Sequence, residues 1–259
     1  MLAQERRQRV LDLVSQRGFV ALSDLAKSIN ASESTIRRDL DYWHDRGVLQ
    51  RTRGGAMYVG DGATLPALEE RSAHQIEEKR QVARAAAERI RDGDSVLLDG
   101  GTTTLEVARL LVGRPLQVVT NSLPIANLFA SSRETDLVLL GGYVSPKTGV
   151  ALGPLTMRMM EDVHVRQTLM GVSGITAKGF FNSNGLLVDT ERQMMRCADQ
   201  VIVVADHTKI GRQALAFLCE LAAVDAVITD SGATEEQRQL LGDELEVIVA
   251  NAGKKAGRS

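Results

Sequence analysis

The chain of 259 residues has only two cysteines, and they stand apart at Cys197 and Cys219. Two cysteines are too few for a small disulfide-stabilised scaffold, and their spacing matches no zinc motif. Both lie in apolar stretches, which is typical of buried thiols in a reducing compartment. We therefore predict no metal site, and nothing in the sequence indicates a cofactor.

Long apolar runs are also missing. No stretch approaches the roughly 18 apolar residues that a membrane helix needs. The first residues, MLAQERRQRVLDLV, are too charged for a signal peptide. We therefore expect a cytoplasmic protein with no membrane contact.

A strong positive balance is absent as well, since the formal net charge is -2. The whole chain is therefore not a polycation that binds nucleic acid through bulk charge. The charge is uneven, however. Residues 1–58 hold ten Lys and Arg against seven Asp and Glu, a balance of +3 that leaves -5 for the rest. This asymmetry indicates an anion-binding unit at the N-terminus.

The first 44 residues carry three helical patterns. Apolar residues at i, i+3 and i+4 predict a helix over residues 5–17, which Gly18 ends. A second, short helix has Ser23 as its expected cap, and Asn30 suits a left-handed turn after it. Ser32 is the expected cap of a third helix. The predicted buried positions of the first two helices are Val10, Leu13, Val14, Leu22, Leu25, Ala26 and Ile29.

The third helix separates apolar from polar side chains. Ile36, Leu40 and Trp43 fall on one face, whereas Ser34 and the arginines that follow it fall on the other. After Gly47, the segment VLQRTRGGAMYV predicts two short strands around a Gly-Gly turn. Three helices followed by a hairpin predict a winged helix-turn-helix over residues 1–58.

A helix held by its apolar face can place its opposite face in the major groove of DNA. Arginine can bind guanine through two hydrogen bonds, and hydroxyl groups bind phosphates. The glycine pair lets the hairpin backbone approach phosphates without a Cβ clash. The alternative is a small helical domain with a solvated basic face. The predicted DNA-binding residues are Ser32, Ser34, Thr35, Arg37, Arg38, Arg51, Arg53, Gly54 and Gly55.

Two segments of this region, LSDLAKSINASESTIRRDL and LQRTRGGA, closely resemble the N-terminal pattern of the DeoR family of bacterial transcriptional regulators. The resemblance covers about residues 3–58. It implies that residues 32–40 form the recognition helix.

Residues 59–76 contain Gly, Pro and Asp with little periodicity, and we predict an interdomain linker there. Residues 77–90 are rich in Ala and charge, and their apolar stripe predicts a helix at the start of a second domain, 77–252. We expect residues 253–259 to be a flexible tail.

Seven apolar runs alternate with helical patterns after residue 94. Runs that are apolar on both alternating faces suit strands buried on both sides, so we predict a mostly parallel α/β sheet with right-handed crossovers. The predicted strands are 95–99, 116–120, 136–140, 167–172, 201–205, 225–230 and 245–250.

Polar loops follow several of these strands. Ligands of open α/β sheets bind at the carboxyl ends of the strands, so the loops should meet at one cleft. Glycine backbone and threonine at a helix N-terminus suit a phosphate, and carboxylate and amide groups suit sugar hydroxyls. We predict a phosphorylated sugar bound by Asp99, Gly100, Gly101, Thr102, Thr103, Thr104, Thr120, Asn121, Ser122, Gly141, Gly142, Gly171, Ser173, Gly174, Asp206 and Lys209.

Each of these loops also has a simpler interpretation. GGTTT and TNS are common as plain turns, and Asp206 with Lys209 could be a surface pair; only their joint position at strand ends favours a ligand site. The four histidines show no ligand spacing, and we expect them to be structural or exposed. The methionines of 157–160 and 194–195 suit a core or a subunit interface.

The same loops extend the family resemblance over nearly the whole chain. LLDGGTTT, VVTNSL, LLGG, GVSGI and VVADHTKIGR are similar to the DeoR-family sensor domain. The resemblance implies a fold like ribose-5-phosphate isomerase and CoA-transferase-type domains, phosphorylated-sugar effectors, and homodimers or homotetramers. The chain departs from the family at Thr208 (usually Ser), at Ile210 (often Phe) and in FFNSNGLLVDTERQMM, residues 180–195. The departure in residues 180–195 bears on the identity of the bound sugar more than on the presence of a sugar site.

Three functions are consistent with these patterns. The leading hypothesis is a repressor that binds operator DNA of a carbohydrate-metabolism operon and is released by a phosphorylated sugar. The second is a sugar-phosphate isomerase with a DNA-binding module, in which Asp99, Asp206 and Lys209 would act as acid and base. Against it, no second carboxylate is evidently paired with Asp99, and we predict no catalytic residue. A transcriptional activator, or a regulator without a small ligand, is the third.

Overall fold

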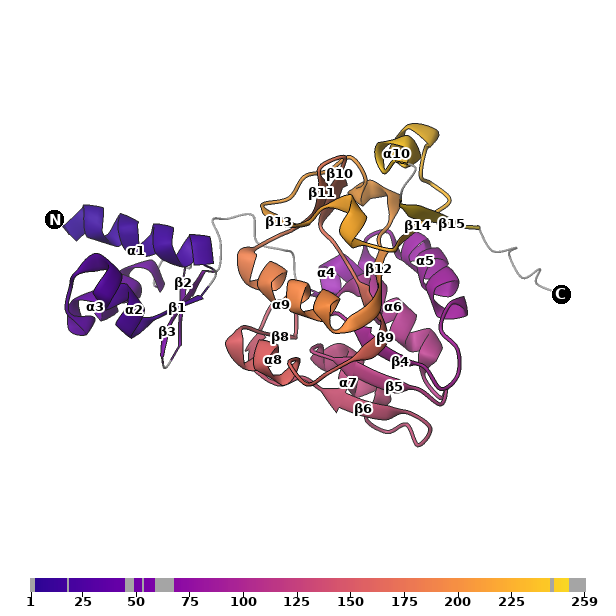
Figure 1. The fold of residues 1–259 in the computed structure, drawn as a ribbon, viewed down its shortest axis with the longest axis horizontal. Helices are drawn as coiled ribbons and strands as arrows, with labels where there is room; N and C mark the ends of the chain where they lie inside the picture. Colours follow the sequence, from indigo (N-terminus) through magenta and orange to yellow (C-terminus); the bar gives the residue numbers. More distant parts are fainter. Residues whose placement is uncertain are drawn as a thin grey trace.

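The computed structural model describes residues 3–17, 19–44, 49–52, 54–58, 68–242 and 245–251. Figure 1 shows a small N-terminal part, with α1–α3 and β1–β3, beside a larger part that holds the remaining helices and strands. Within the described ranges, no helix combines the length and the apolar character needed to span a membrane.

The N-terminal part contains the three predicted helices and the predicted hairpin. The helices are α1 (Ala3–Arg17), α2 (Leu22–Ile29) and α3 (Glu33–His44). The hairpin strands are β2 (Leu49–Thr52) and β3 (Gly55–Tyr58), and a further strand, β1 (Phe19–Ala21), pairs antiparallel with β3. Apolar residues of all three helices form one core, as the periodicity predicted. This architecture is a winged helix-turn-helix.

The helix caps agree only in part with the sequence analysis. Asn30 takes the predicted left-handed conformation, with φ 54°. Ser32 precedes α3, and its Oγ accepts a hydrogen bond from the Thr35 N–H at 3.3 Å, as expected of a cap. The prediction for Ser23 is wrong, because α2 begins one residue earlier, at Leu22, after an extended Ala21 that offers no side-chain cap. The pairing of β1 with β3 fixes that early start.

The larger part is built on a seven-stranded sheet in which every pair of neighbouring strands is parallel. All seven predicted strands are confirmed, and their order in the sheet is β15-β14-β12-β9-β4-β5-β6. Their bounds are β4 Ser95–Leu98, β5 Gln117–Thr120, β6 Asp136–Leu139, β9 Val165–Met170, β12 Ala198–Val204, β14 Ala226–Asp230 and β15 Glu246–Ala250.

Helices cover both faces of this sheet. On one face, α5 (Ile76–Glu88), α6 (Thr102–Leu111) and α7 (Leu123–Phe129) form a core with Leu98 of β4. On the other face, α9 (Gly185–Arg196) packs with Leu97 of the same strand. Successive side chains of a strand point to opposite faces, which explains why the runs are apolar at every position.

Shorter elements frame the sheet and were not predicted. The strands β7 (Tyr143–Ser145) and β8 (Val150–Leu152) form a hairpin, and β10 (Gly174–Thr176), β11 (Gly179–Asn182) and β13 (Ala216–Cys219) form a small antiparallel sheet. Two short helices, α8 (Pro154–Met159) and α10 (Glu235–Leu240), and the 3-10 turns η1 (His207–Lys209) and η2 (Leu221–Ala223) complete this part. These elements are too short for a periodic signal.

The segment before the sheet differs from the predicted linker. Residues 59–67 lie outside the described residues, as does the predicted tail 253–259. Residues 68–73, however, form a helix, α4 (Leu68–Ala73), and Gln75, with φ 51°, leads directly into α5. The second part of the proposed linker is therefore structured, and it lies against α6.

Candidate functional site

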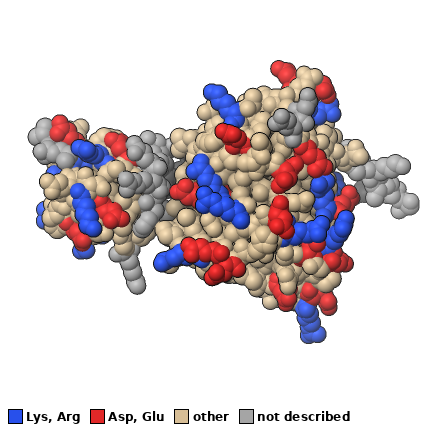
Figure 2. Space-filling view, in the orientation of Figure 1, with Lys and Arg blue, Asp and Glu red and all other residues tan. Residues whose placement is uncertain are grey.

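The exposed face of α3 carries most of the residues predicted to bind DNA. Ser32, Ser34, Arg37 and Arg38 are exposed and Thr35 is half-buried, while Ile36 and Leu40 on the opposite face are buried. Figure 2 shows basic and acidic side chains interspersed over the visible face of the N-terminal part. Arg37 forms an i,i+4 ion pair with Glu33 at 3.5 Å, and both side chains are more than half exposed. Such a pair is weak and separates easily when a phosphate approaches.

A buried carboxylate holds α3 against α1. Asp39 is 1% exposed, and its carboxylate accepts hydrogen bonds from Arg6 Nε at 2.6 Å and from Arg7 Nε at 3.3 Å. Trp43 Nε1 donates to the Arg7 carbonyl at 2.8 Å. Apolar periodicity does not predict this link, and its one signal in the sequence is an Asp among the buried apolar positions of α3. The link orients the exposed face of α3.

The described part of the hairpin includes three of the four residues predicted to bind DNA, Arg51, Gly54 and Gly55. Arg51 is exposed and forms an ion pair with Asp41 of α3, and Arg53 lies outside the described residues. Gly54 is exposed, with open space where a Cβ would stand. Gly55 is different: a Cβ there would lie 2.2 Å from the Val20 carbonyl oxygen, so glycine is required by the packing of β3 on β1. This packing by itself requires glycine at Gly55.

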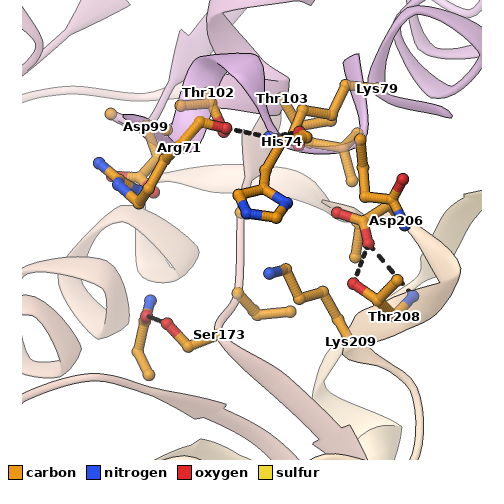
Figure 3. Close-up of a pocket in the computed structure, with 18 of the residues that line it drawn as sticks. Arg71, His74, Lys79, Asp99, Thr102, Thr103, Ser173, Asp206, Thr208 and Lys209 are labelled. Carbon is orange, nitrogen blue, oxygen red and sulfur yellow. Dashed lines mark hydrogen bonds between the residues drawn. The ribbon is translucent and has the colours of Figure 1, made fainter. Parts of the chain in front are cut away.

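A cavity of about 790 Å³ lies at the carboxyl ends of the parallel strands (Figure 3). Loops after β4, β9 and β12 reach it, as the alternation of strands and helices predicted. The predicted residues that line the cavity are Asp99, Gly100, Gly101, Thr102, Thr103, Gly171, Ser173, Asp206 and Lys209.

Seven predicted residues do not belong to that lining: Thr104, Thr120, Asn121, Ser122, Gly141, Gly142 and Gly174. Several of their polar groups bond within the fold, although Asn121 Oδ1 is buried without a hydrogen-bond partner among the described residues. The Thr120 hydroxyl donates to the Leu98 carbonyl at 2.7 Å, and the Asn121 amide donates to the Ala151 carbonyl at 3.0 Å. The turn interpretation of TNS accounts for these contacts.

One side of the cavity suits an anion. The helix α6 begins after Gly101, which offers no side-chain cap, so the N–H groups of Thr102 and Thr103 face the cavity without a capping partner. Lys209 reaches in from the opposite wall (Figure 3), and its ammonium has no partner among the described residues. A helix N-terminus and a lysine together provide hydrogen-bond donors and positive charge for a phosphate.

Lys79 adds a buried cation at this side. Its ammonium donates to the carbonyl groups of Arg71 in α4 and of His74 just after that helix. Burial lowers the pKa of Lys79, while the charge of Asp206 raises it. Lys79 stands on the apolar stripe of α5, three residues before Val82. A lysine on an apolar stripe was the available signal for this residue.

Other lining residues were missed because of where they lie. Arg71 and His74 belong to the segment assigned to a linker, and His74 was expected to be structural or exposed. Asn182 lies in β11, Thr208 lies in η1 and Arg212 follows η1, and the sequence does not predict these short elements. Asp206 holds the turn at η1, where it accepts a hydrogen bond from the Thr208 N–H at 3.1 Å.

Two buried carboxyl groups stand at the other side of the cavity. Burial raises the pKa of Asp99 to about 6, although backbone N–H groups of Gly100 and Gly171 and the charge of Arg71 oppose the shift. Burial also raises the pKa of Glu191, and the charge of Asp99 raises it further. The prediction that Asp99 has no carboxylate partner is therefore wrong. Glu191 comes from α9, ninety-two positions along the chain, and no local pattern connects the two.

Glu191 ends a short chain of hydrogen bonds. The Ser173 hydroxyl donates to Asn182 Oδ1 at 2.5 Å, and the Asn182 amide donates to Glu191 Oε1. The other oxygen, Glu191 Oε2, is buried and has no hydrogen-bond partner among the described residues. The helix that carries Glu191, α9, also contacts α1 and β3 of the N-terminal part.

Two protein-family models match this chain. The model of the DeoR-like helix-turn-helix domain matches residues 6–61, and the model of the DeoR C-terminal sensor domain matches residues 74–231.

Curated relatives match over most of their length. The glycerol-3-phosphate regulon repressor of Escherichia coli (strain K12) is 32% identical over 92% of this chain and 95% of its own length. The HTH-type transcriptional repressor GlcR of Bacillus subtilis (strain 168) is 31% identical over 98% of this chain and 100% of its own length. The putative aga operon transcriptional repressor of Escherichia coli O157:H7 is 31% identical over 88% of this chain and 86% of its own length.

Solved structures resemble the chain more distantly. The β subunit of eIF2B from Chaetomium thermophilum covers 94% of this chain and 70% of its own, with 12% identity and a TM-score of 0.45. Ribose 5-phosphate isomerase A from Neisseria gonorrhoeae covers 51% of this chain and 52% of its own, with 16% identity and a TM-score of 0.38.

Proposed function

The chain belongs to the DeoR family of transcriptional regulators, and from this membership we propose that it represses a carbohydrate-metabolism operon until a phosphorylated sugar binds. The observation that carries the proposal is the presence, in one chain, of an exposed arginine-bearing helix face and a cavity with a helix N-terminus and a lysine.

The DNA-binding half of the proposal rests on α3 and the hairpin. Arg37 and Arg38 reach base edges or phosphates from α3, and the hydroxyl groups of Ser34 and Thr35 bind phosphates. Arg51 of β2 leaves its ion pair with Asp41 to contact the DNA backbone. The link between Asp39 and α1 supports this arrangement because it fixes the angle at which α3 enters the groove.

The effector half rests on the cavity. The phosphate binds to the N–H groups at the start of α6 and to Lys209, and the sugar extends toward Asp99 and Ser173. One relative is named for the glycerol-3-phosphate regulon, which supports a phosphorylated effector for this chain. The effector shifts the equilibrium between two arrangements of the protein toward the arrangement that it binds more tightly.

The helix α9 couples the two halves. Its residues line the cavity, and the same helix contacts α1 and β3. A ligand that displaces α9 therefore changes how the DNA-binding part is held, and DNA affinity falls.

The chain works as a homodimer or homotetramer on operator DNA in the bacterial cytoplasm. Two observations support association between copies: β6 is an edge strand of the sheet, and Val138 and Leu139 on it are 47% and 40% exposed. A dimer also doubles the DNA contacts across two half-sites.

We propose a regulator and not an enzyme, although the cavity contains a second carboxyl group. The named relatives are repressors, which supports this choice. Turnover of ribose 5-phosphate or of another sugar phosphate by the purified protein would contradict it.

The proposal is tested with DNA from upstream of the protein's own gene. We expect sequence-selective binding that weakens as salt rises, because phosphate contacts release counterions, and we expect a phosphorylated sugar to weaken it further. Binding that is equal for random DNA, or unaffected by any sugar phosphate, would overturn the proposal.

A further inference from the structure

Lys79 is the most deeply buried of the cationic side chains that line the cavity. It is 5% exposed, whereas Arg71 and Lys209 are half-buried and Arg212 is exposed. Its ammonium donates two hydrogen bonds, to the carbonyl groups of Arg71 and His74. An ammonium has three N–H donors, and the described residues supply an acceptor for only two of them. One donor therefore remains for a ligand.

The charge of this ammonium is not balanced by an acid in contact with it. Both acceptors are neutral carbonyl groups, and no described carboxylate forms an ion pair with Lys79. Burial lowers the pKa of Lys79 most, and the charges of Lys209 and Arg71 lower it further, while Asp206 and Glu106 raise it. A buried charge without a partner is costly, so an anion that binds beside it stabilises the protein.

The two carboxylates that raise this pKa are each engaged elsewhere. Glu106 forms ion pairs with Arg80 at 3.7 Å and with Arg109 at 3.2 Å. Asp206 accepts hydrogen bonds from the N–H and the hydroxyl group of Thr208. Both acids therefore act on the buried ammonium only at a distance, whereas an anion that enters the cavity can bind it directly.

The anion side of the cavity brings a phosphate to this ammonium. Lys79 stands on α5, which packs along α6. In Figure 3, Lys79 lies on the same wall as Thr102 and Thr103 at the start of α6, and Lys209 extends toward them from the opposite wall. The charge of Lys209 acts on the pKa of Lys79, so the two ammonium groups lie close enough to interact. A phosphate held by the start of α6 and by Lys209 is therefore placed beside Lys79.

The two hydrogen bonds that Lys79 already makes fix the segment that leads in from the DNA-binding part. Arg71 stands in the last turn of α4, where carbonyl groups have no partner within the helix, and His74 follows just after it. Nine residues, 59–67, separate β3 from α4 in the sequence. The helix α4 is thus the first described element after the winged helix-turn-helix, and one ammonium group joins it to the cavity.

We propose that Lys79 is a phosphate-binding residue that links the bound phosphate to α4: its third N–H binds the phosphate, while the other two hold the carbonyl groups of Arg71 and His74. This inference rests on the proposed function, because it assumes that the phosphate binds at the start of α6. It gives the cavity a second route to the DNA-binding part, besides α9. The alternative is that Lys79 only caps α4 and stabilises the fold.

The first test measures binding to the full chain by titration calorimetry, with inorganic phosphate, glycerol 3-phosphate, glucose 6-phosphate and glucosamine 6-phosphate as probes. Lys79→Gln removes the charge and keeps an N–H donor for the α4 carbonyl groups, whereas Lys79→Met removes both. Each variant should bind the probes about 10- to 100-fold more weakly than the wild type, the value of a charge-assisted hydrogen bond. Arg84→Gln is the matched control and should bind normally, because Arg84 is exposed on the same helix and outside the cavity lining.

The second test measures hydrogen exchange at the backbone amides of residues 68–75. In the wild type, a saturating concentration of the probe that binds most tightly should slow exchange there, because the phosphate immobilises the ammonium that holds α4. In Lys79→Gln, the same probe at a concentration that saturates the variant should leave this exchange unchanged. The melting temperature of each variant confirms that it is folded.

The outcomes distinguish this inference from the proposed function. If both Lys79 variants bind the probes as tightly as the wild type, while Lys209→Ala weakens every probe, Lys79 only caps α4 and the inference fails alone. It also fails alone if the probes bind the wild type but do not slow exchange in residues 68–75. If no probe, inorganic phosphate included, binds even at millimolar concentration, the proposed phosphate site fails and the inference falls with it.

Discussion

The arginines of α3 and the charged groups of the sensor cavity differ most in their contact with water. Arg37 and its partner Glu33 are 57% and 51% exposed, whereas Glu191 and Asp99 are 2% and 3% exposed. Charges on a surface cost little to maintain and can bind a long polyanion with modest geometric demands. Buried charges destabilise the empty cavity, and they strengthen each contact with a ligand that matches them.

This difference predicts that substitutions in the two regions fail in different ways. A change on the exposed face of α3 should alter DNA binding and leave stability almost unchanged. A change in the cavity should alter ligand binding and stability together. Four predictions follow, from the largest expected effect to the smallest. The first concerns the packing that supports α3, and the other three test the separation itself.

Gly55→Ala should unfold the N-terminal part at a lower denaturant concentration. Its Cβ would stand 2.2 Å from the Val20 carbonyl oxygen, so β1 and β3 must separate, at a cost of about 3 kcal/mol. Trp43, the only tryptophan, reports this part by fluorescence, and circular dichroism reports the larger sheet. Gly54→Ala is the matched control, since nothing lies within 4 Å of its Cβ position. Equal stability of the two variants would refute the role of Gly55.

Lys209→Ala should weaken binding of a phosphorylated sugar by about 10- to 100-fold, the value of a charge-assisted hydrogen bond of roughly 1.5–3 kcal/mol. DNA binding without ligand should stay at the wild-type level, which gives a repressor that the ligand no longer releases. Lys147→Ala is the control, because Lys147 is exposed and outside the cavity lining. An unchanged dissociation constant in Lys209→Ala would remove Lys209 from the phosphate site.

Arg38→Ala should weaken DNA binding by roughly 1–3 kcal/mol if a base contact is lost. If the contact is to a phosphate, affinity falls equally for all sequences, and the slope of log K against log salt falls by about 1. Fluorescence anisotropy at several salt concentrations separates the two cases, with Arg84→Ala on α5 as the control. Ligand affinity of the sensor should not change, and a change there would contradict the separation of the two regions.

Asp99→Asn should stabilise the protein in alkaline buffer. The native pKa of about 6 lies above the ordinary value of 3.8, so the stability from this group is complete at low pH and is lost as pH rises through 6. The Asp99→Asn variant should therefore have a larger free energy of unfolding than the wild type at about pH 8. Near about pH 4 the two proteins should be equally stable. The difference between the two pKa values corresponds to about 3 kcal/mol in the free energy of unfolding. An asparagine side chain does not reproduce every hydrogen bond of the protonated carboxyl group, so we expect a net gain of about 1 kcal/mol.

Urea unfolding of Asp99→Asn at both pH values measures this gain, with the exposed Asp162→Asn as the control. A loss of stability at about pH 8, larger than at about pH 4, would show that Asp99 is stabilised by its partners and not destabilised by burial.

Local patterns predicted the three helices and the hairpin of the DNA-binding part, but not the start of α2, the strand β1 or the link through Asp39. The faces of α3 follow from the spacing of Ile36, Leu40 and Trp43, and the cap follows from Ser32. The seven strands were equally predictable, because each is a continuous apolar run between polar residues. From their parallel order, the convergence of the loops after β4, β9 and β12 could also be predicted.

The remaining lining residues depend on tertiary contacts that no local pattern encodes. Arg71 and His74 enter the cavity because α4 packs on α6, and their segment reads as a linker. Glu191 faces Asp99 because α9 lies over the sheet, far from β4 in sequence. The reverse error arose at Thr120 and Asn121, whose polar groups stand at a strand end but bond to backbone carbonyls of the fold. Strand-end position alone does not distinguish these two kinds of residue.

The central claim is that one chain links DNA binding to a ligand in the sensor cavity. The most direct test is an anisotropy titration of labelled upstream DNA with the wild-type protein, with and without a saturating concentration of the sugar phosphate that binds most tightly in the calorimetric titrations. We predict that the ligand raises the dissociation constant for DNA by roughly 5- to 150-fold, and that saturating DNA weakens ligand binding by the same factor. A dissociation constant for DNA that stays the same with the cavity saturated would contradict the claim.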